Sequence, residues 1–397
     1  MDLQRSVGFV DYPNSEVEPY LAVNPTNPEN LIAVWQQDRW NDGSSRGNLA
    51  GVSFDGGESW TLVSATGSNA CTGNPSWIRA TDPWVTFAPD GTAYFMHLAT
   101  WSTSVLSEDT VRFDGMLVTR STDGGLTWGE PTTLVLDTSR TRFHDKNSIT
   151  ADPNDSDLVY AVWDVLTGPP SDNGNPAAGE NSLAFTGATI FTRSTDGGLT
   201  WEPIRTILEP GTLDQTIGNQ IVVRPASAGG ELVNVLNLVH VAANAQKTRG
   251  SNVAVQISSD HGSTWSGAIV AEKILSVPTV DPDSGLPVRT ANFILDAAVD
   301  PTNGNLYAVW EDARFSGGAY NDTALITSTD GGTWSSPIAA RRRPLGWRGQ
   351  PARRRRGMRP RGGLVHPHPR HYRTRLCHRP ATPDADCSSS DRPRERR

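Results

Sequence analysis

The sequence predicts an all-β fold, a β-propeller of four-stranded blades. A repeated octapeptide, a repeated hairpin phrase and the lack of helical periodicity all point to it. The octapeptide STDGGLTW occurs at 121–128 and again, letter for letter, at 194–201. Looser copies occupy 53–60, 258–265 and 328–334, and successive copies start 64 to 73 residues apart. Self-similarity at a long period indicates a repeat array rather than two or three unrelated domains.

The hairpin phrase precedes the octapeptide in the repeats. It reads YLAVNPTNPENLIAVW at 20–35, ITADPNDSDLVYAVW at 149–163 and AVDPTNGNLYAVW at 298–310. Apolar runs rich in Val, Ile, Tyr and Trp flank an Asn-Pro or Asp-Pro turn, which is typical of two strands joined by a tight turn. Segments 85–96 and 221–239 are the same unit with altered turns. A third strand leads into the octapeptide and a fourth leaves it, so each repeat supplies four strands.

Four-stranded repeats of this length predict propeller blades, because packing around an axis protects most strand edges. We expect residues 1–340 to form the propeller domain. Its five recognisable blades are predicted at roughly 20–64, 82–136, 147–209, 218–275 and 294–340. The apolar flanks of the first and fifth blades are expected to lack a neighbour, which would lower stability.

Residues 341–397 differ sharply in composition from the rest. They carry 18 basic and 4 acidic side chains, whereas residues 1–340 carry 17 and 39, and they contain no Ile, no Phe and one Val. Such an Arg/Pro-rich tail cannot bury a core. Two interpretations stay open, a disordered extension that binds something anionic and the product of a shifted reading frame. The abrupt change near residue 340 favours the shift.

Composition also bears on partners and cofactors. The acidic body argues against general nucleic-acid binding, and no apolar run approaches the roughly 20 residues that cross a membrane. Residues 1–20 lack the apolar core of a secretion signal. Cys71 is the only cysteine before residue 341, so neither a disulfide within the repeats nor a metal or cofactor is expected. We interpret the loop at 169–181 as a surface excursion rather than a calcium site. The oligomeric state is not indicated.

The octapeptide has its own turn chemistry. Its Asp can accept hydrogen bonds from the turn, and the following glycines supply positive φ without a Cβ penalty. Its Trp can pack under the turn. Five equivalent copies cannot all serve one site, so we expect a structural role for their carboxylates. These belong to Asp55, Asp123, Asp196, Asp260 and Asp330.

These octapeptides resemble the Asp boxes, or BNR repeats, of the sialidase (neuraminidase) superfamily, over most of residues 1–340. The resemblance implies a six-bladed glycoside hydrolase propeller, possibly of exo-α-sialidase type, that acts on terminal sialic acid or another acidic sugar. In that family three arginines bind the substrate carboxylate, a Tyr assisted by a Glu attacks the sugar, and an Asp is the acid/base. Other Asp-box propellers only bind ligands, so a non-catalytic glycan- or protein-binding propeller is the alternative. The resemblance also suggests a secreted or extracytoplasmic location.

The candidate site residues lie on the face opposite the octapeptides, where irregular loops collect. AVWQQDR at 33–39 resembles the family's phrase for one clamp arginine, which makes Arg39 a substrate-binding candidate. By order along the chain Asp42 is the candidate acid/base, with Asp38 next. Three further arginines are substrate-binding candidates, namely Arg79, Arg289 and Arg314.

Other polar residues are predicted in the links between blades, and they are Asp82, Arg142, His144, Asp145, Lys146 and Asp214. Ion pairing between neighbouring loops is the alternative role for each of them. The family's Arg-Ile-Pro phrase corresponds to VEPYL at 17–21, which keeps the proline but has no arginine. No nucleophilic Tyr is identified, since Tyr372 lies in the Arg-rich tail.

Overall fold

The computed structural model describes residues 10–41, 43–101, 113–139, 142–168, 186–241, 248–288 and 294–340. Within these ranges the chain forms strands and three single-turn 3-10 helices, η2 (Ala70–Thr72), η3 (Ala226–Ala228) and η4 (Arg314–Ser316). The predicted all-β fold is confirmed. Among the described residues, no helix is long and apolar enough to cross a membrane.

The strands form five antiparallel units of four, in which neighbours along the chain are neighbours in the sheet. Blade 1 comprises β1 (Asp11–Val23), β2 (Leu31–Trp40), β3 (Ser45–Ser53) and β4 (Thr61–Ser64). Blade 2 comprises β5 (Arg79–Phe87), β6 (Ala93–Thr100), β7 (Asp114–Ser121) and β8 (Thr132–Asp137). Blade 3 comprises β9 (Arg142–Ala151), β10 (Val159–Thr167), β11 (Thr186–Ser194) and β12 (Arg205–Leu208).

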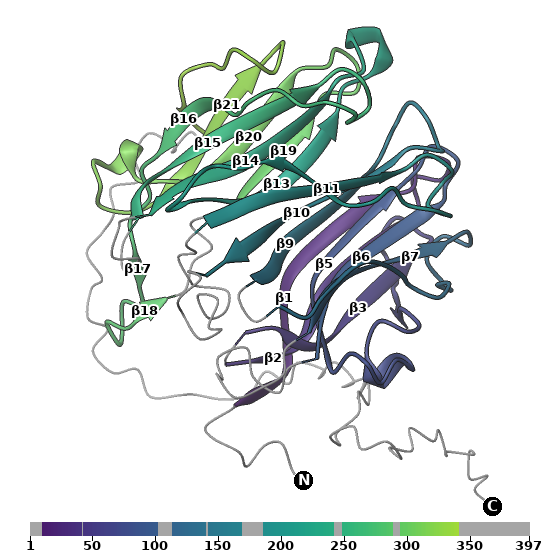
Figure 1. The fold of residues 1–397 in the computed structure, drawn as a ribbon. Coiled ribbons are helices and arrows are strands. Elements are labelled where there is room, and N and C mark those ends of the chain that lie inside the picture. The colour runs from purple at the N-terminus through teal and green to yellow at the C-terminus, as the bar shows by residue number, and fades with distance from the viewer. Residues whose placement is uncertain are drawn as a thin grey trace, which may run out of the picture.

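Blade 4 comprises β13 (Asp214–Val223), β14 (Leu232–Val241), β15 (Thr248–Ser258) and β16 (Ile269–Ile274). Blade 5 comprises β19 (Leu295–Val299), β20 (Leu306–Asp312), β21 (Asp322–Ser328) and β22 (Ile338–Ala339). A small hairpin of β17 (Thr279–Val280) and β18 (Pro287–Val288) lies between them in the chain. One parallel pairing, Gly187 with Gln215, connects blades 3 and 4. The first strands of successive blades contact one another in the order β1, β5, β9, β13, β19, which makes the array a β-propeller (Figure 1).

Each hairpin phrase folds as the sequence predicts, because the Asn or Asp before its proline closes the turn. The side chains of Asn24, Asp152 and Asp300 each accept a hydrogen bond from the backbone N–H two residues later, at 2.9, 2.8 and 2.7 Å. This is the geometry that makes Asn and Asp favourable before such turns. The phrases therefore join the first and second strands of blades 1, 3 and 5.

The five octapeptides form the turns between the third and fourth strands, and we call them the octapeptide turns. In blade 3, Asp196 accepts hydrogen bonds from the Ser194 hydroxyl (2.7 Å) and from the Thr200 backbone N–H and hydroxyl (2.8 and 2.6 Å). The bonds from Thr200, with the one from Ser194, lower the pKa of Asp196 to about 2. The short turn of blade 5 keeps the scheme, because Asp330 accepts from the Thr333 N–H at 2.7 Å.

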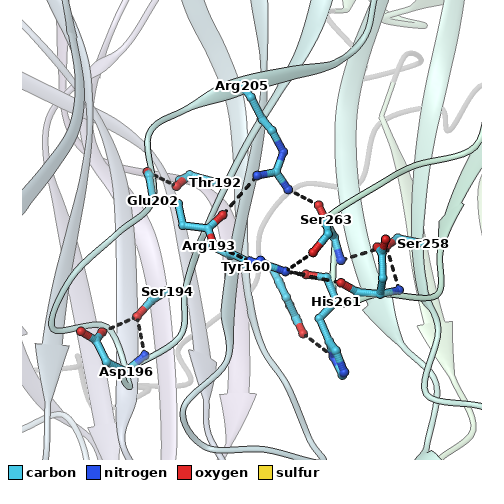
Figure 2. Close-up of polar contacts among 12 residues, drawn as sticks. Tyr160, Thr192, Arg193, Ser194, Asp196, Glu202, Arg205, Ser258, His261 and Ser263 are labelled. Carbon is cyan, nitrogen blue, oxygen red and sulfur yellow. Dashed lines mark hydrogen bonds and ion pairs between the residues drawn. The ribbon is translucent and has the colours of Figure 1, made fainter.

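Charged side chains also join blades 3 and 4 on the face of the octapeptide turns (Figure 2). Arg193 of β11 donates to the His261 carbonyl (2.6 Å) and the Ser263 hydroxyl (3.0 Å) in the turn of blade 4. Glu202 accepts from Arg193 at 2.9 Å and from Arg205 at 3.1 Å, so one carboxylate holds both guanidinium groups. The turn of one blade is thus bound by the blade before it.

The strands of the central blades are more deeply buried than those of the terminal blades. All eight residues of β6 are buried, and so are eight of the nine in β10. In β20 buried residues alternate with half-buried ones, and β1 contains no fully buried residue. Blades 1 and 5 therefore each present one sheet face that no described part of the chain covers.

The first strand of most blades starts before the predicted blade. Strands begin at Asp11, Arg79, Arg142 and Asp214, whereas the hairpin phrases suggested starts at 20, 82, 147 and 218. The link residues Asp82, Arg142, His144, Asp145, Lys146 and Asp214 therefore lie inside strands, which corrects their predicted placement in inter-blade links. The reason is an irregularity in each strand, described next.

Candidate functional site

Four of the first strands carry a bulge at equivalent places. The pairing with the second strand shifts near Glu18, Asp82, Lys146 and Gly218. Each of these residues has a positive φ, at 53°, 48°, 45° and 68°. A left-handed backbone costs a non-glycine residue about 1–2 kcal/mol. A bulge changes the direction in which a side chain points, and residues with strained backbones are enriched at functional sites. We therefore take these positions as the candidate site.

The bulged side chains of blades 1, 2 and 3 meet. The Lys146 ammonium Nζ lies 2.8 Å from Glu18 Oε2 and 3.5 Å from Asp82 Oδ2. Blades 1 and 3 are not neighbours, and their first strands both contact β5 of blade 2, so Glu18 and Lys146 meet beside Asp82 of that strand. The Asp82 and Lys146 side chains are nearly buried, at 5% and 15% exposure, whereas that of Glu18 is 37% exposed.

Blade 1 adds two polar side chains to this group. Gln36 Nε2 donates to Asp82 Oδ1 at 3.3 Å, and the Arg39 guanidinium donates to Gln36 Oε1 at 2.7 Å. We call Glu18, Gln36, Arg39, Asp82 and Lys146 the axial cluster. It holds two carboxylates and two cationic groups.

Beside the axial cluster lies a pair of buried carboxyl groups. Asp145 and Asp164 are directly opposite each other in β9 and β10, and both are almost completely buried. Burial, and then the charge of Asp145, raise the pKa of Asp164 well above its usual range. Asp145 Oδ1 accepts the Lys146 backbone N–H at 3.0 Å, and Asp82 Oδ2 accepts the same group at 3.2 Å. These bonds hold the bulge at Lys146.

Two of the predicted arginines lie near the end of β2, Arg39 within that strand and Arg79 at the start of the neighbouring β5. Arg39 belongs to the axial cluster, and the Arg79 guanidinium lies 4.6 Å from the centre of the Trp40 ring. Arg79 is buried and donates to the Gly43 carbonyl at 3.2 Å. Asp38, the second candidate for the acid/base, has a positive φ of 58° and accepts the Asn14 N–H at 2.7 Å.

Arg314 lies elsewhere, at the junction of blades 4 and 5. It donates to both carboxylate oxygens of Asp312, at 2.8 and 2.9 Å, and to Glu272 at 3.1 Å. These bonds raise its pKa above the ordinary value. None of its described contacts involves the axial cluster. Asp42, Arg289, the loop at 169–181 and residues 341–397 lie outside the described residues.

Arg142 and His144 line a cavity of about 310 Å³ between blades 2 and 3. Asp137 binds both, at 2.9 Å from Arg142 Nε and 3.2 Å from His144 Nε2. The Trp163 indole donates to His144 Nδ1 at 2.7 Å, so Nε2 carries the proton that faces Asp137. These residues connect two blades.

One tyrosine, Tyr20, lies in the first strand of blade 1, but its surroundings disfavour the ionised phenolate form. Tyr20 stacks on Trp84 with 3.8 Å between ring centroids. Burial, and then the charge of Asp296, raise the pKa of Tyr20 to about 12. Sequence reasoning did not single out Glu18 or Gln36. Glu18 could have been found from the sequence, because the alternation of apolar and polar residues is interrupted just before the hairpin phrase of blade 1.

Comparisons with known proteins find likeness of fold. No family model matches the sequence, and no curated protein matches it. Among solved structures, a Dyadobacter fermentans protein of unknown function is 14% identical with a TM-score of 0.50, over 85% of this chain and 87% of that one. A Hadza microbial sialidase has 19% identity and a TM-score of 0.49, over 82% of this chain. The match spans 58% of that sialidase's length.

An α-L-arabinanase from Penicillium chrysogenum is 13% identical with a TM-score of 0.49, over 82% of this chain and 83% of that enzyme. At these identities the likeness concerns the fold alone.

Proposed function

We propose that the protein is a carbohydrate-active propeller that binds an acidic sugar at the axial cluster and hydrolyses its glycosidic bond. The carboxylates of Glu18 and Asp82 on either side of one ammonium group, that of Lys146, carry this proposal. Glycoside hydrolases commonly use two carboxyl groups flanking the scissile bond. Lys146 and Arg39 add positive charge that suits a sugar carboxylate.

The roles proposed for the residues of the axial cluster are based on how exposed each side chain is and on what it contacts. Glu18 is the more exposed carboxyl group. When the substrate carboxylate binds Lys146 in its place, Glu18 takes up a proton from water and gives it to the glycosidic oxygen as the C–O bond breaks. Asp82 contacts Lys146 and Gln36 at 3.5 and 3.3 Å, and its role is to accept the proton of the attacking water. Arg39 binds the substrate carboxylate. Asp42, the acid/base suggested by the family resemblance, is the competing candidate for the role of Glu18.

The finer proposal is an exo-α-sialidase type of specificity, for terminal sialic acid, with water rather than a tyrosine as the attacking group. Residues 1–340 form the one catalytic domain in this proposal and residues 341–397 a separate tail. The octapeptide repeats and the Arg39 phrase support it. Arg79, Arg289 and Arg314 are the further arginines proposed for substrate binding. The internal ion pairs of Arg314 make it the weakest member of that set.

A non-catalytic glycan-binding propeller is the second candidate. It is favoured by the absence of an arginine in VEPYL at 17–21 and by the raised pKa of Tyr20. A phenol with a pKa near 12 is a poor nucleophile at neutral pH. This candidate predicts saturable glycan binding without turnover.

The test uses the full chain with fluorogenic glycosides of sialic acid, glucuronic acid and neutral arabinose. Glu18→Gln and Asp82→Asn are expected to reduce kcat by about 100-fold or more, as loss of general acid–base catalysis does. Arg39→Ala is expected to raise KM for the acidic substrates while sparing the neutral one. Glu16→Gln, an exposed glutamate on the same strand, is the matched control.

Asp42→Ala decides between the two candidates for the acid. Loss of turnover in Asp42→Ala with full activity in Glu18→Gln would transfer the role to Asp42. Turnover that survives Glu18→Gln, Asp82→Asn and Arg39→Ala would remove the axial cluster as the site. Binding on a glycan array with no hydrolysis of any substrate would establish the second candidate.

A further inference from the structure

An arginine precedes the octapeptide turn in blades 2 and 3, and in both blades it lies beside a tyrosine. Arg120 pairs with Tyr94 across the sheet of blade 2. Arg193 pairs with Tyr160 in the same way in blade 3. In blade 5 the corresponding tyrosine, Tyr307, faces a threonine instead. The junction between blades 2 and 3 and that between blades 3 and 4 are therefore built on the same pair of side chains.

In the junction between blades 3 and 4 the arginine has several partners (Figure 2). Arg193 binds the Glu202 carboxylate of its own blade at 2.9 Å. It also donates to the His261 carbonyl and the Ser263 hydroxyl in the turn of blade 4, at 2.6 and 3.0 Å. Arg205 binds the same carboxylate at 3.1 Å. The charge of Arg193 is thus balanced within its own blade.

In the junction between blades 2 and 3 this carboxylate is missing. Gly129 occupies the position of Glu202, because each donates its backbone N–H to the carbonyl of the arginine before the turn, at 2.9 Å. No described carboxylate forms an ion pair with Arg120, and its Nε has no hydrogen-bond partner among the described residues. Burial raises the pKa of Tyr94, and a hydrogen bond with Arg120 and the charge of Arg120 act in the opposite direction. The guanidinium therefore contacts a neutral hydroxyl where its counterpart contacts a carboxylate.

The turn that faces Arg120 differs from the turn that faces Arg193 as well. Leu199 occupies the position at which Ser263 supplies a hydroxyl in blade 4. The Gly197 carbonyl of this turn accepts a hydrogen bond from the tyrosine hydroxyl of blade 2, at 2.9 Å. Two side chains that hold the arginine in one junction are thus replaced by glycine and leucine in the other.

A cavity of about 450 Å³ lies where these side chains are replaced. Arg120, Trp128 and Thr132 of blade 2 line it, together with Gly198 and Leu199 of the turn of blade 3. Cavities of roughly 300–1,000 Å³ are the usual size of small-molecule sites. The Trp128 side chain is 6% exposed, and its indole N–H has no hydrogen-bond partner among the described residues. A ligand atom that accepts this hydrogen bond would satisfy a buried donor.

The indole alone does not distinguish this junction from the others. Trp201 and Trp265, at the same position of their turns, also have an indole N–H without a described partner. What is particular to the junction between blades 2 and 3 is that such an indole lines a cavity together with an arginine that has no described counter-ion. The ligand must therefore bring a negative charge as well as an acceptor.

The surroundings favour a ligand with one negative charge and several hydroxyl groups. Arg120 offers a single guanidinium, and Thr122 brings a hydroxyl to the cavity. The exposed Glu130 also lines the cavity, and the charges of Asp90 and Asp157 act on the nearby tyrosine hydroxyl. These three carboxylates would repel a dianion such as phosphate more strongly than a monocarboxylate.

We propose that this junction is a second sugar-binding site, which takes an acidic sugar with its carboxylate on Arg120, as Glu202 lies on Arg193. A guanidinium can hold a carboxylate by two parallel hydrogen bonds. A sugar hydroxyl or ring oxygen accepts from the Trp128 indole. The site shares no residue with the axial cluster, so it binds sugar without hydrolysing it and does not depend on the function proposed for that cluster.

The test follows the indole N–H signal of Trp128 by NMR in the 15N-labelled full chain, with Trp128→Phe to identify the signal by its absence. Glucuronic acid is expected to shift this signal saturably in the wild type. The same shift is expected in Arg39→Ala, in which the axial cluster has lost its guanidinium. Glucose, the neutral counterpart, is expected to bind about tenfold more weakly or worse, because it lacks the charged hydrogen bond.

Gly129→Glu is the decisive variant, because it restores the carboxylate that blade 3 has at this position. Gly129 has no positive φ, and a Cβ there would lie 3.5 Å from the Arg120 carbonyl, so a side chain fits. The variant is expected to weaken binding of glucuronic acid by about tenfold or more, because the new carboxylate occupies Arg120. Gly129→Ala is the matched control and is expected to bind as the wild type does. Arg120→Gln is expected to lose binding, and Arg193→Gln to keep it.

A Trp128 signal that glucuronic acid leaves unmoved in the wild type and in Arg39→Ala would overturn the proposal. Equal affinity for glucose, or unchanged affinity in Gly129→Glu, would overturn it as well. Propionate, a carboxylate without hydroxyl groups, would overturn the assignment to a sugar if it bound as tightly as glucuronic acid. A saturable shift at Trp128 in a chain that hydrolyses no glycoside would support this site while the function proposed for the axial cluster failed.

Discussion

Blades 2 and 3 have neighbours on both faces, whereas blades 1 and 5 have a neighbour on one. The octapeptide turn has the same internal hydrogen bonds in blade 1 as in blade 3, around Asp55 and Asp196. What differs is the packing of its tryptophan, which is half-exposed in blade 1 and buried in blade 2. The turn is therefore encoded locally, and its contribution to stability comes from the adjacent blade, as expected for a repeat protein.

The largest expected contrast is between tryptophans at one position of the turn. Trp128→Ala is expected to lower the free energy of unfolding by about 3–5 kcal/mol, as removal of a large buried side chain does. Trp60→Ala removes a half-exposed side chain and is expected to cost about 1 kcal/mol. Urea unfolding at neutral pH measures both. Equal losses of unfolding free energy would show that the neighbouring blade does not determine how much this tryptophan stabilises the fold.

The next contrast is between glycines. Gly125 and Gly57 have positive φ values of 98° and 95°, so alanine at either carries the same left-handed strain of about 1–2 kcal/mol. At Gly125 the new methyl group also collides with Ile32, which is expected to add about 1–3 kcal/mol. The difference between the unfolding free energies of Gly125→Ala and Gly57→Ala measures the effect of the contact between blades 1 and 2. A difference near zero would contradict a role for this contact in stability.

A smaller contrast concerns the tyrosine hydroxyls. Tyr94→Phe removes the hydrogen bond to the Gly197 carbonyl and is expected to destabilise the protein by about 1 kcal/mol. Tyr307→Phe removes no described hydrogen bond and is expected to leave stability unchanged. Thermal unfolding followed by circular dichroism compares the two. A loss in Tyr307→Phe as large as in Tyr94→Phe would reveal a partner for Tyr307.

Lowering the pH is expected to destabilise the octapeptide turns of terminal and central blades to the same extent. Hydrogen bonds from Ser59 and Thr200 hold the pKa values of Asp55 and Asp196 at about 2, below the ordinary value of 3.8. Because the folded pKa is depressed, the stabilisation is present above about pH 4 and is lost as pH falls towards 2. Asp55→Asn and Asp196→Asn should each reduce the loss of stability between pH 5 and 2 by the same amount, as the midpoints of urea unfolding at these pH values would show. Unequal reductions would mean that burial also affects the pKa of one of the two carboxyl groups.

The fold class could be predicted because the turns and hairpins are local. Asn24, Asp152 and Asp300 close hairpin turns with bonds two residues away, and the octapeptides repeat at one place in each blade. The first strands were harder, because the bulges at Glu18, Asp82 and Lys146 put polar, left-handed residues inside strands. Polar residues at these places look like links between blades when only the sequence is read.

The axial cluster depends on contacts that no local pattern contains. Glu18 and Lys146 are 128 residues apart, and they meet only because the array curves around its axis. Sequence reasoning did identify Arg39 from its phrase and Asp82 and Lys146 as polar candidates. It grouped them with Arg314, whose contact with Glu272 of blade 4 is visible only in three dimensions.

The four bulges have a consequence for how such a protein can change over evolutionary time. Three of them bring a side chain into the axial cluster from a strand whose remaining residues keep the sheet paired, so a different side chain there leaves the framework intact. Glutamate, aspartate, lysine and glycine already occupy equivalent positions at 18, 82, 146 and 218. If the axial cluster binds the sugar as proposed, single substitutions at these positions are expected to shift ligand preference. Gly218 is the equivalent position without a side chain.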